Sequence, residues 1–345
     1  MRKQVLSVLV VAMAFAFSAP SYAAPVEYKL KQKFTIGGDG GWDYLTYDPV
    51  GKRLFISRAT RVQVVDTDKG TVIAEIANTP GVHGIALAQD QNKGYTSNGR
   101  ENTVTVFDLK TLKETSRIKL PEGDNNPDAI LYDPASKRVF SFNGRSKNAT
   151  VIDATTDKVV SSIPLHGKPE FAAADGKGMV YVNIEDTAEI QAIDAKKATV
   201  TNSWPITGCE EPSGMAMDIK SRRIFSGCHN KVMAVFNPDT AKVVTTVPIG
   251  DGVDANGFDP GANLAFSSNG DGTLTVVHED SADKYTVAQN AQTQRGARTM
   301  ALNPNSHEVY LVTAEFEEQP PAEGQTRPRR TMKPGSFTLL VMEKK

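Results

Sequence analysis

Seven polar or charged residues recur once per repeat along the chain, and their types could bind a charged ligand or a metal ion. In chain order they are Asp43, His83, Asp128, Glu170, Ser213, Asp254 and Arg298. Carboxylates gathered around a narrow opening repel one another and resist ionisation when they lose water, so a cation or basic group would relieve them. The four carboxylates, Asp43, Asp128, Glu170 and Asp254, are therefore candidate ligands of a divalent cation.

Two interpretations of these seven residues remain open. They could form a polar pocket for a small ligand or an ion, or they could bond to loop amides and solvate the opening, as Asp and Asn in turns often do. The sequence has no HExxH, CxxC or EF-hand pattern and no nucleophile elbow. Local motifs therefore indicate no cofactor, and any divalent cation would depend on residues brought together by the fold.

An aromatic residue that recurs at regular spacing indicates which structural elements position these residues. It occurs at Phe55, Tyr95, Phe140, Tyr181, Phe225, Phe266 and Tyr310, with spacings of 40, 45, 41, 44, 41 and 44 residues. Each unit holds short alternating runs rich in Val, Ile, Thr and aromatics, separated by turn residues such as Asp48-Pro49 and Asp133-Pro134. Runs of this kind are too short for helices and are typical of strands.

Four strands in a period of about 42 residues predict a β-propeller blade. Seven aromatics predict seven blades of four antiparallel strands in one all-β domain spanning 24–345. A β-solenoid is the alternative, but its repeats are usually shorter. The predicted blades are 40–81, 82–124, 125–167, 168–208, 209–250, 251–294 and 295–345.

The last unit ends after its third strand, SFTLLVMEKK (336–345). A matching strand, VEYKLKQKFTIGG (26–38), precedes the first blade. We expect this N-terminal strand to complete the last blade, because pairing the two ends of the chain removes two free sheet edges.

The inner strands of the blades must line the channel, and counting five residues back from each turn gives the seven polar positions. His83 needs a two-residue adjustment, which we ascribe to a shorter turn in its blade. Loops on the same face carry Arg100 and Arg145, which complete the predicted ligand-binding set.

The last blade has a long Pro-rich loop, 316–335, acidic first and then basic through Arg327 and Lys333. It is either a lid or partner-docking segment, or a plain surface insertion.

The chain begins with a basic pair, an apolar run and a small-x-small site ending at Ala23. This pattern predicts a signal peptide over 1–23, cleaved near Ala23, and a periplasmic or secreted protein; an uncleaved anchor helix is the alternative. The remaining chain has no apolar run long enough to span a bilayer.

Loss of the signal peptide would remove Arg2 and Lys3 and change the formal net charge from −1 to −3. This charge argues against a broad nucleic-acid-binding face but leaves room for a local basic patch.

The sequence has two cysteines, Cys209 and Cys228. In an oxidising compartment such a pair indicates a disulfide, and two free buried thiols are the alternative. The hairpin register places the two residues nearly opposite each other, so we predict a structural disulfide.

Several segments resemble a known family. The Tyr-Val-Asn triplet at 181–183, the Ser-Asn-Gly units after an aromatic and the alternating Val runs ending in Asp resemble YVTN-repeat propellers. GCEEPSGMAMD (208–218), RRIFSGCHNKV (222–232) and PGSFTLLV (334–341) resemble the YncE-like group of exported bacterial proteins. The resemblance covers essentially the whole mature chain and implies a seven-bladed periplasmic propeller. A member of that group is associated with single-stranded DNA binding.

The combined observations favour an exported, monomeric, non-catalytic binding protein whose site lies at the channel mouth. Its partner would be a small ligand or a protein. A metal-dependent, lactonase-like hydrolase is one alternative, with the carboxylates holding an ion that polarises a carbonyl. An interaction scaffold that uses the 316–335 loop is another. Binding of single-stranded DNA is less favoured because of the net charge.

Overall fold

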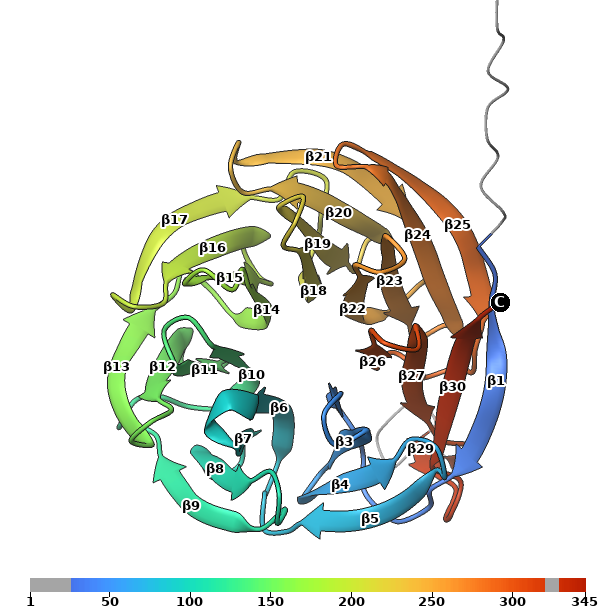
Figure 1. Ribbon diagram of the computed structural model, residues 1–345, viewed down its shortest axis with the longest axis horizontal. Coiled ribbons are helices and arrows are strands. Elements are labelled where there is room, and N and C mark those ends of the chain that lie inside the picture. The colour runs from blue at the N-terminus through green and yellow to red at the C-terminus, as the bar shows by residue number, and fades with distance from the viewer. Residues whose placement is uncertain (1–25, 320–328) are drawn as a thin grey trace, which may run out of the picture.

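The computed structural model describes residues 26–319 and 329–345, and within these ranges it contains seven four-stranded antiparallel sheets arranged in a ring (Figure 1). The first three sheets consist of β2 (Leu45–Asp48), β3 (Arg53–Arg58), β4 (Arg61–Asp66) and β5 (Thr71–Ile76); β6 (Val82–Ala88), β7 (Lys93–Asn98), β8 (Thr103–Asp108) and β9 (Glu114–Lys119), with the 3-10 turn η1 (Gln89–Gln91); and β10 (Pro127–Asp133), β11 (Arg138–Asn143), β12 (Asn148–Asp153) and β13 (Lys158–Pro164). The predicted seven-bladed propeller is confirmed.

The remaining blades repeat this plan, with one change in the last. They consist of β14 (Pro169–Ala174), β15 (Met179–Ile184), β16 (Glu189–Asp194) and β17 (Thr199–Pro205); β18 (Pro212–Asp218), β19 (Arg223–Cys228), β20 (Val232–Asn237) and β21 (Lys242–Pro248); β22 (Val253–Asp259), β23 (Leu264–Asn269), β24 (Thr273–Ser281) and β25 (Lys284–Gln292); and β26 (Met300–Asn303), β27 (Glu308–Thr313), β30 (Thr338–Lys344) and β1 (Tyr28–Thr35). In each blade the first strand in this order lies nearest the axis (Figure 1).

The two ends of the chain close the ring. Strand β1 runs antiparallel to β30, from the Tyr28–Lys344 pair to the Thr35–Thr338 pair, and forms the outer edge of the last blade (Figure 1). Tyr28 also donates a hydrogen bond from its hydroxyl to the carbonyl of His307, 2.9 Å away. The predicted closure by an N-terminal strand is therefore confirmed.

The repeating aromatic has a packing role that explains its period. The apolar core of the described residues divides into seven clusters, each spanning two neighbouring blades. Each cluster contains one of the seven aromatics, and every one of these side chains is at most 2% exposed. A ring of seven blades has seven interfaces, so one large side chain per repeat fills each of them.

In five of the blades, the acid or amide that ends the third strand is a turn residue. Asp66, Asp108, Asp153, Asp194 and Asn237 each accept hydrogen bonds from backbone amides two and three residues later. Such side-chain bonds hold the turn that starts the outer strand. These acids therefore fix the blades and are not part of a site.

Within the described residues, no helix has the length and apolar character that a bilayer crossing needs. The predicted signal peptide, 1–23, lies outside the described residues.

Candidate functional site

The strand register brings the seven predicted channel residues to equivalent positions. In every blade the repeat aromatic pairs with a residue of the inner strand, and the predicted residue lies three positions before that partner. For example, Phe55 pairs with Thr46, which follows Asp43 by three, and Tyr95 pairs with Ala86, which follows His83 by three.

The adjustment made for His83 was correct, but its stated cause was wrong. The turn between β6 and β7 runs from Ala88 to Lys93 and is as long as the turn from Asp48 to Arg53 in the first blade. The difference is that the turn contains the 3-10 segment η1, and Asp90 lies inside this segment. Ala88 occupies the place that Asp48 takes in the first blade, and Asp90 lies two residues later. Counting five residues back from Asp90 therefore gives Ile85, two residues after His83.

A β-bulge presents the channel residue in five of the blades. The register of β6, β10, β14, β18 and β22 shifts at the residues that follow the first pair, between Val82 and Ile85 in the case of β6. A bulge bends a strand locally and redirects a side chain. Five channel residues lie within these shifts: His83, Asp128, Glu170, Ser213 and Asp254. Their side chains therefore do not follow the alternation between the two faces of the sheet that the rest of each strand shows.

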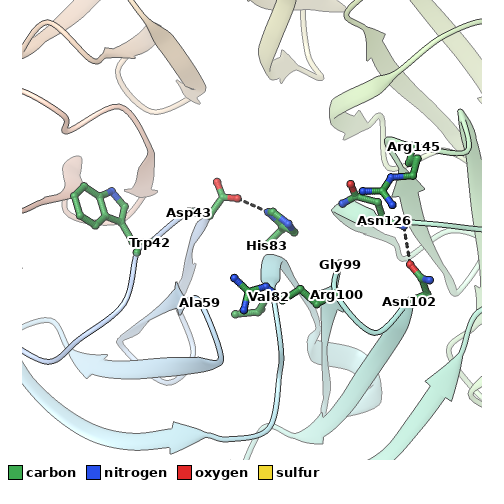
Figure 2. Close-up of a pocket in the computed structure, with 12 residues that line it drawn as sticks. Trp42, Asp43, Ala59, Val82, His83, Gly99, Arg100, Asn102, Asn126 and Arg145 are labelled. Atoms are coloured by element: carbon green, nitrogen blue, oxygen red, sulfur yellow. Dashed lines mark hydrogen bonds and ion pairs between the residues drawn. The ribbon is translucent and has the colours of Figure 1, made fainter. Parts of the chain in front are cut away.

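Three of the residues form a cluster at one side of the channel mouth. The Nδ1 atom of His83 lies 2.6 Å from Oδ2 of Asp43 and 3.7 Å from Oδ1 of Asp128 (Figure 2 shows the first contact). The side chains are 32%, 25% and 22% exposed, so all three are sheltered yet accessible. One potential ligand atom from each residue lies within 4.8 Å of the others, which makes this group a candidate metal centre.

The other channel residues have partners of their own. Lys168 places its Nζ 2.6 Å from Oε1 of Glu170 and also contacts the carboxylate of Glu185. Arg298 places Nε 3.2 Å from Oδ2 of Asp254 without forming a hydrogen bond to that oxygen. Ser213 donates to the carbonyl and Oδ1 of Asp254, at 3.2 and 3.3 Å. The seven residues thus form one cluster of three and two further groups, each of which includes or contacts a basic side chain.

The shared surroundings of these carboxylates alter their protonation. Burial raises the pKa of Asp128 to about 6; His83 lowers it, and Asp43 raises it further. Burial and the neighbouring Asp128 raise the pKa of Glu170 to about 8, against the opposing effect of Lys168. Burial also raises the pKa of Asp254. Burial lowers the pKa of His83, but the hydrogen bond that His83 donates to Asp43 and the nearby carboxylates outweigh it, and the net shift is upward. Asp128, Glu170 and Asp254 therefore give up their protons less readily than an isolated carboxylate does.

Two aromatic rings that sequence reasoning missed lie next to the channel residues. Tyr44 follows Asp43 and Phe171 follows Glu170, and their rings stack with centroids 4.3 Å apart. Tyr44 lies directly before β2 in the first blade and Phe171 lies in β14 of the fourth blade, so this stack crosses the channel. The corresponding residues of the other five blades are small: Gly84, Ala129, Gly214, Ala255 and Thr299. The sequence does carry a signal for this stack, because only two of the seven equivalent positions are aromatic and the other five are small.

A pocket of about 500 Å³ opens beside the cluster of three (Figure 2). Asp43 and His83 line it on one side, and Arg100 and Arg145, the two predicted loop arginines, line it elsewhere. Trp42 adds an apolar surface, and its ring packs 5.3 Å from that of Phe337. Asp128, Glu170, Ser213, Asp254 and Arg298 do not line this pocket, although the first four lie on strands around the same channel.

A buried arginine holds the wall that carries Trp42 and Asp43. The guanidinium of Arg58 donates hydrogen bonds to the carbonyls of residues 37–40, at 3.0 to 3.2 Å, and to the side chain of Gln63 at 2.8 Å. It also lies over the ring of Phe337, 3.6 Å from the centroid. Arg58 is fully buried, so it supports the pocket from behind and cannot itself contact a ligand.

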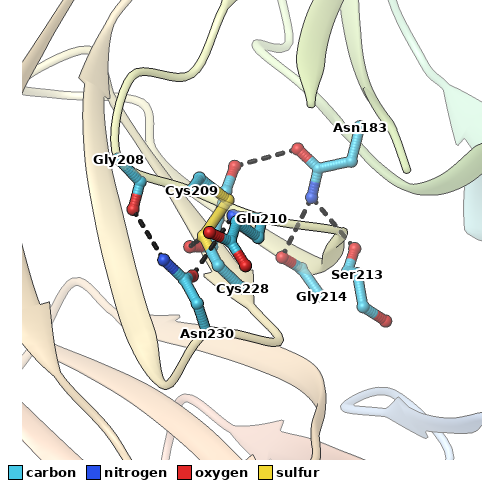
Figure 3. Close-up of a disulfide and its surroundings, with 9 residues drawn as sticks. Asn183, Gly208, Cys209, Glu210, Ser213, Gly214, Cys228 and Asn230 are labelled. Carbon is cyan, nitrogen blue, oxygen red and sulfur yellow. Dashed lines mark hydrogen bonds between the residues drawn. A yellow bond between two sulfur atoms is a disulfide. The ribbon is translucent and has the colours of Figure 1, made fainter. Parts of the chain in front are cut away.

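The two cysteines form a disulfide, as predicted (Figure 3). Cys209 lies in the segment that enters β18, and Cys228 ends β19, so the bond fixes the start of the inner strand that carries Ser213. Asn183 of the previous blade donates to the carbonyls of Ser213 and Gly214, at 2.9 and 3.1 Å. The disulfide therefore has a structural place beside the channel.

The long loop of the last blade contains a short hairpin. Strands β28 (Phe316–Gln319) and β29 (Arg329–Met332) pair antiparallel, and Phe316 packs against Trp42 with ring centroids 6.0 Å apart. Residues 320–328, including Arg327, lie outside the described residues. The described base of the loop thus touches the pocket wall through Trp42.

Comparisons with known proteins support the fold and leave the activity open. No family model matches the chain. A segment of 84 residues is 33% identical to the uncharacterized protein YncE of Salmonella typhimurium and, equally, to that of Salmonella typhi. The match covers 24% of this chain and only 24% of the length of each relative.

Two solved structures have the same architecture. The hydrazine synthase of Kuenenia stuttgartiensis matches with a TM-score of 0.69 and 18% identity, over 80% of this chain and 94% of the other. A chain in the crystal structure of a mitotic checkpoint complex matches with a TM-score of 0.73 and 15% identity, over 97% and 98% of the two chains. Identities this low show a shared fold alone. The chain is a seven-bladed β-propeller that resembles the YncE proteins in sequence.

Proposed function

We propose that this chain is an exported, non-catalytic binding protein that holds a small charged ligand at the mouth of its central channel. The observation that carries the proposal is the pocket of about 500 Å³ with an acidic group on one wall and two arginines on another. A volume of this size suits a small molecule, and a few well-placed polar groups in such a pocket set the ligand's orientation.

The arginines indicate an anionic group on the ligand. Across residues 26–319 and 329–345, the side chains of Arg100 and Arg145 have no ion-pair or hydrogen-bond partner, and both residues are exposed. Guanidinium groups bind carboxylate and phosphate oxygens through two parallel hydrogen bonds. Asp43, which lines the same pocket, would accept hydrogen bonds from hydroxyl or ammonium groups of the same ligand. An amino acid or a hydroxy acid has this combination of groups.

The state of the channel hydroxyl argues against one kind of enzyme, a hydrolase that uses Ser213 as its nucleophile. Among the described residues, the Ser213 hydroxyl donates to Asp254 and no histidine is among its hydrogen-bond partners, so it lacks the neighbouring base that activates a serine nucleophile. Export to an oxidising compartment such as the periplasm is supported by the Cys209–Cys228 disulfide.

The test is a thermal-unfolding and calorimetric screen of the chain lacking residues 1–23, in the presence of EDTA. Glutamate, serine, succinate, glucose 6-phosphate and choline serve as probes of differing charge. We expect an anionic or zwitterionic probe to raise the unfolding midpoint, because binding to the folded state alone stabilises it. The double variant Arg100→Gln/Arg145→Gln should lose the shift, and Lys110→Gln, an exposed cation on the β8–β9 turn, should keep it. Binding that survives the double variant, or a response to choline alone, would contradict the proposed site.

A further inference from the structure

We propose that Asp43, His83 and Asp128 bind one first-row divalent metal ion of the zinc type at the channel mouth. This site goes beyond the proposed function, because it would form with the metal alone and needs neither pocket arginine. Among the described residues, the only other group of this kind is Glu185, Glu211 and His229, in which Glu211 and His229 are exposed.

The geometry of the three residues is close to that of a metal centre. Zinc bonds to His nitrogen and carboxylate oxygen at about 2.0–2.2 Å, which puts neighbouring ligand atoms roughly 3.4 Å apart in a tetrahedron. The His83 and Asp128 atoms, 3.7 Å apart, already have nearly this spacing. The Asp43 oxygen, 2.6 Å from Nδ1, would have to withdraw by less than 1 Å. Asp43 lies in the connection before β2 and not in a strand, so such a movement breaks no sheet pairing.

The donor set selects the class of metal. One imidazole and two carboxylates suit zinc and nickel, whereas calcium and magnesium prefer sites made only of oxygen. Both cysteines are held in a disulfide and cannot supply thiolate ligands. The arrangement therefore favours Zn²⁺ over Ca²⁺ and Mg²⁺.

A second observation points to something bound at this place. The hydroxyl oxygen of Tyr44 is buried and has no hydrogen-bond partner within the described residues. Tyr44 directly follows Asp43, one of the proposed ligands, and its ring stacks on that of Phe171, which follows Glu170. A buried hydroxyl without a partner is unusual in folded proteins. A water molecule carried by the metal ion would satisfy it.

The ion would have an open coordination position. Three protein ligands leave a fourth position in a tetrahedral site, as in zinc sites that accept water or a ligand. Asp43 and His83 line the pocket, so the open side can be reached from it (Figure 2). The simplest competing explanation is that Asp43 and His83 form an ion pair and no metal binds.

The experiment uses tag-free, disulfide-intact protein without residues 1–23, stripped with EDTA and dialysed. Zn²⁺ is titrated calorimetrically, and Co²⁺ is titrated as a spectroscopic probe, because four-coordinate Co²⁺ absorbs strongly in the visible range. We expect one equivalent of Zn²⁺ to bind, and Ca²⁺ or Mg²⁺ to bind at least 100-fold more weakly. His83→Gln and Asp128→Asn should each weaken Zn²⁺ binding at least tenfold and abolish the Co²⁺ band.

His229→Gln is the matched control, because it removes the histidine of the other candidate group. It should leave both signals unchanged, and so should Arg100→Gln/Arg145→Gln, which separates this proposal from that of the organic ligand. Urea unfolding of each variant shows whether it is folded. If Zn²⁺ fails to bind at millimolar concentration, or if His229→Gln removes binding and His83→Gln does not, the proposal is wrong.

Discussion

Tyr44 and Phe171 stack across the central channel with their ring centroids 4.3 Å apart and their planes 18° from parallel. One ring comes from the first blade and the other from the fourth, and each follows a carboxylate of the channel mouth. The pair adds an aromatic surface and one phenolic hydroxyl at the positions that follow Asp43 and Glu170.

The buried hydroxyl of Tyr44 leads to a first prediction. Without a partner, it has lost hydration and gained no protein hydrogen bond in return. In metal-free buffer, Tyr44→Phe should therefore leave the stack intact and raise the free energy of unfolding by about 1 kcal/mol, measured by urea denaturation. Tyr95→Phe is the control, because the Tyr95 hydroxyl donates to Asp157 at 2.9 Å and its loss should destabilise the protein. A large loss of stability in Tyr44→Phe would mean that the hydroxyl has a partner after all.

The raised pKa of Glu170 predicts a pH-dependent stability. Burial and Asp128 raise this pKa to about 8 from its usual 4.5, and the side chain is 13% exposed. Between these two values the folded state binds more protons than the unfolded state, so the contribution of Glu170 to stability falls as the pH rises. Glu170→Gln stays neutral at every pH. Relative to wild type it should gain on the order of 2 kcal/mol at pH 9 and little near pH 4.5.

Urea unfolding at pH 5, 7 and 9 in EDTA measures this difference. Lys168 keeps its contact with Glu185 in the variant, so its charge does not become isolated. Glu101→Gln, which removes an exposed carboxylate, controls for the change in net charge. A stability difference between Glu170→Gln and wild type that is constant over this range would show that Glu170 titrates normally.

Close packing near the axis predicts an intolerance at Gly84. A Cβ at this position would lie 2.9 Å from the carbonyl oxygen of Asp128 and 2.9 Å from the amide nitrogen of Ile130, both in β10. Gly84→Ala should therefore push apart the inner strands of two blades and destabilise the protein by about 2 kcal/mol. At Gly144 the nearest atoms are 3.7 and 3.8 Å away in the flexible side chain of Lys168, so Gly144→Ala should be nearly neutral. Equal midpoints of thermal unfolding for the two variants would refute the explanation.

The fold was predictable because its determinants are local and repeated. Each interface between blades needs one buried aromatic such as Phe55, and each outer turn needs an acid such as Asp66, so both recur at the blade period. The same period located the channel residues. Their partners were not predictable, because the contact of His83 with Asp43 and Asp128 joins three blades. Contacts between blades depend on rotamers and on the bulges of the inner strands, which leave no periodic trace.

Trp42 and Arg58 show the same limit, since neither belongs to the repeat. Arg58 ends β3, is buried behind the pocket wall and donates hydrogen bonds from its guanidinium to the carbonyls of residues 37–40. An isolated arginine gives no sequence signal for such a role, because the carbonyls it satisfies belong to the backbone.

The buried position of Arg58 yields the last prediction. A lysine keeps the charge but has a single ammonium group, which cannot reach several carbonyls and stack on Phe337 at the same time. Arg58→Lys should lower the free energy of unfolding by about 2–3 kcal/mol, because hydrogen bonds to a charged donor are lost from a buried site. It should also loosen residues 37–43 and increase amide hydrogen exchange there, while exchange in β18 stays unchanged. Uniform acceleration across all blades would instead mean that Arg58 supports the whole fold and not the pocket wall in particular.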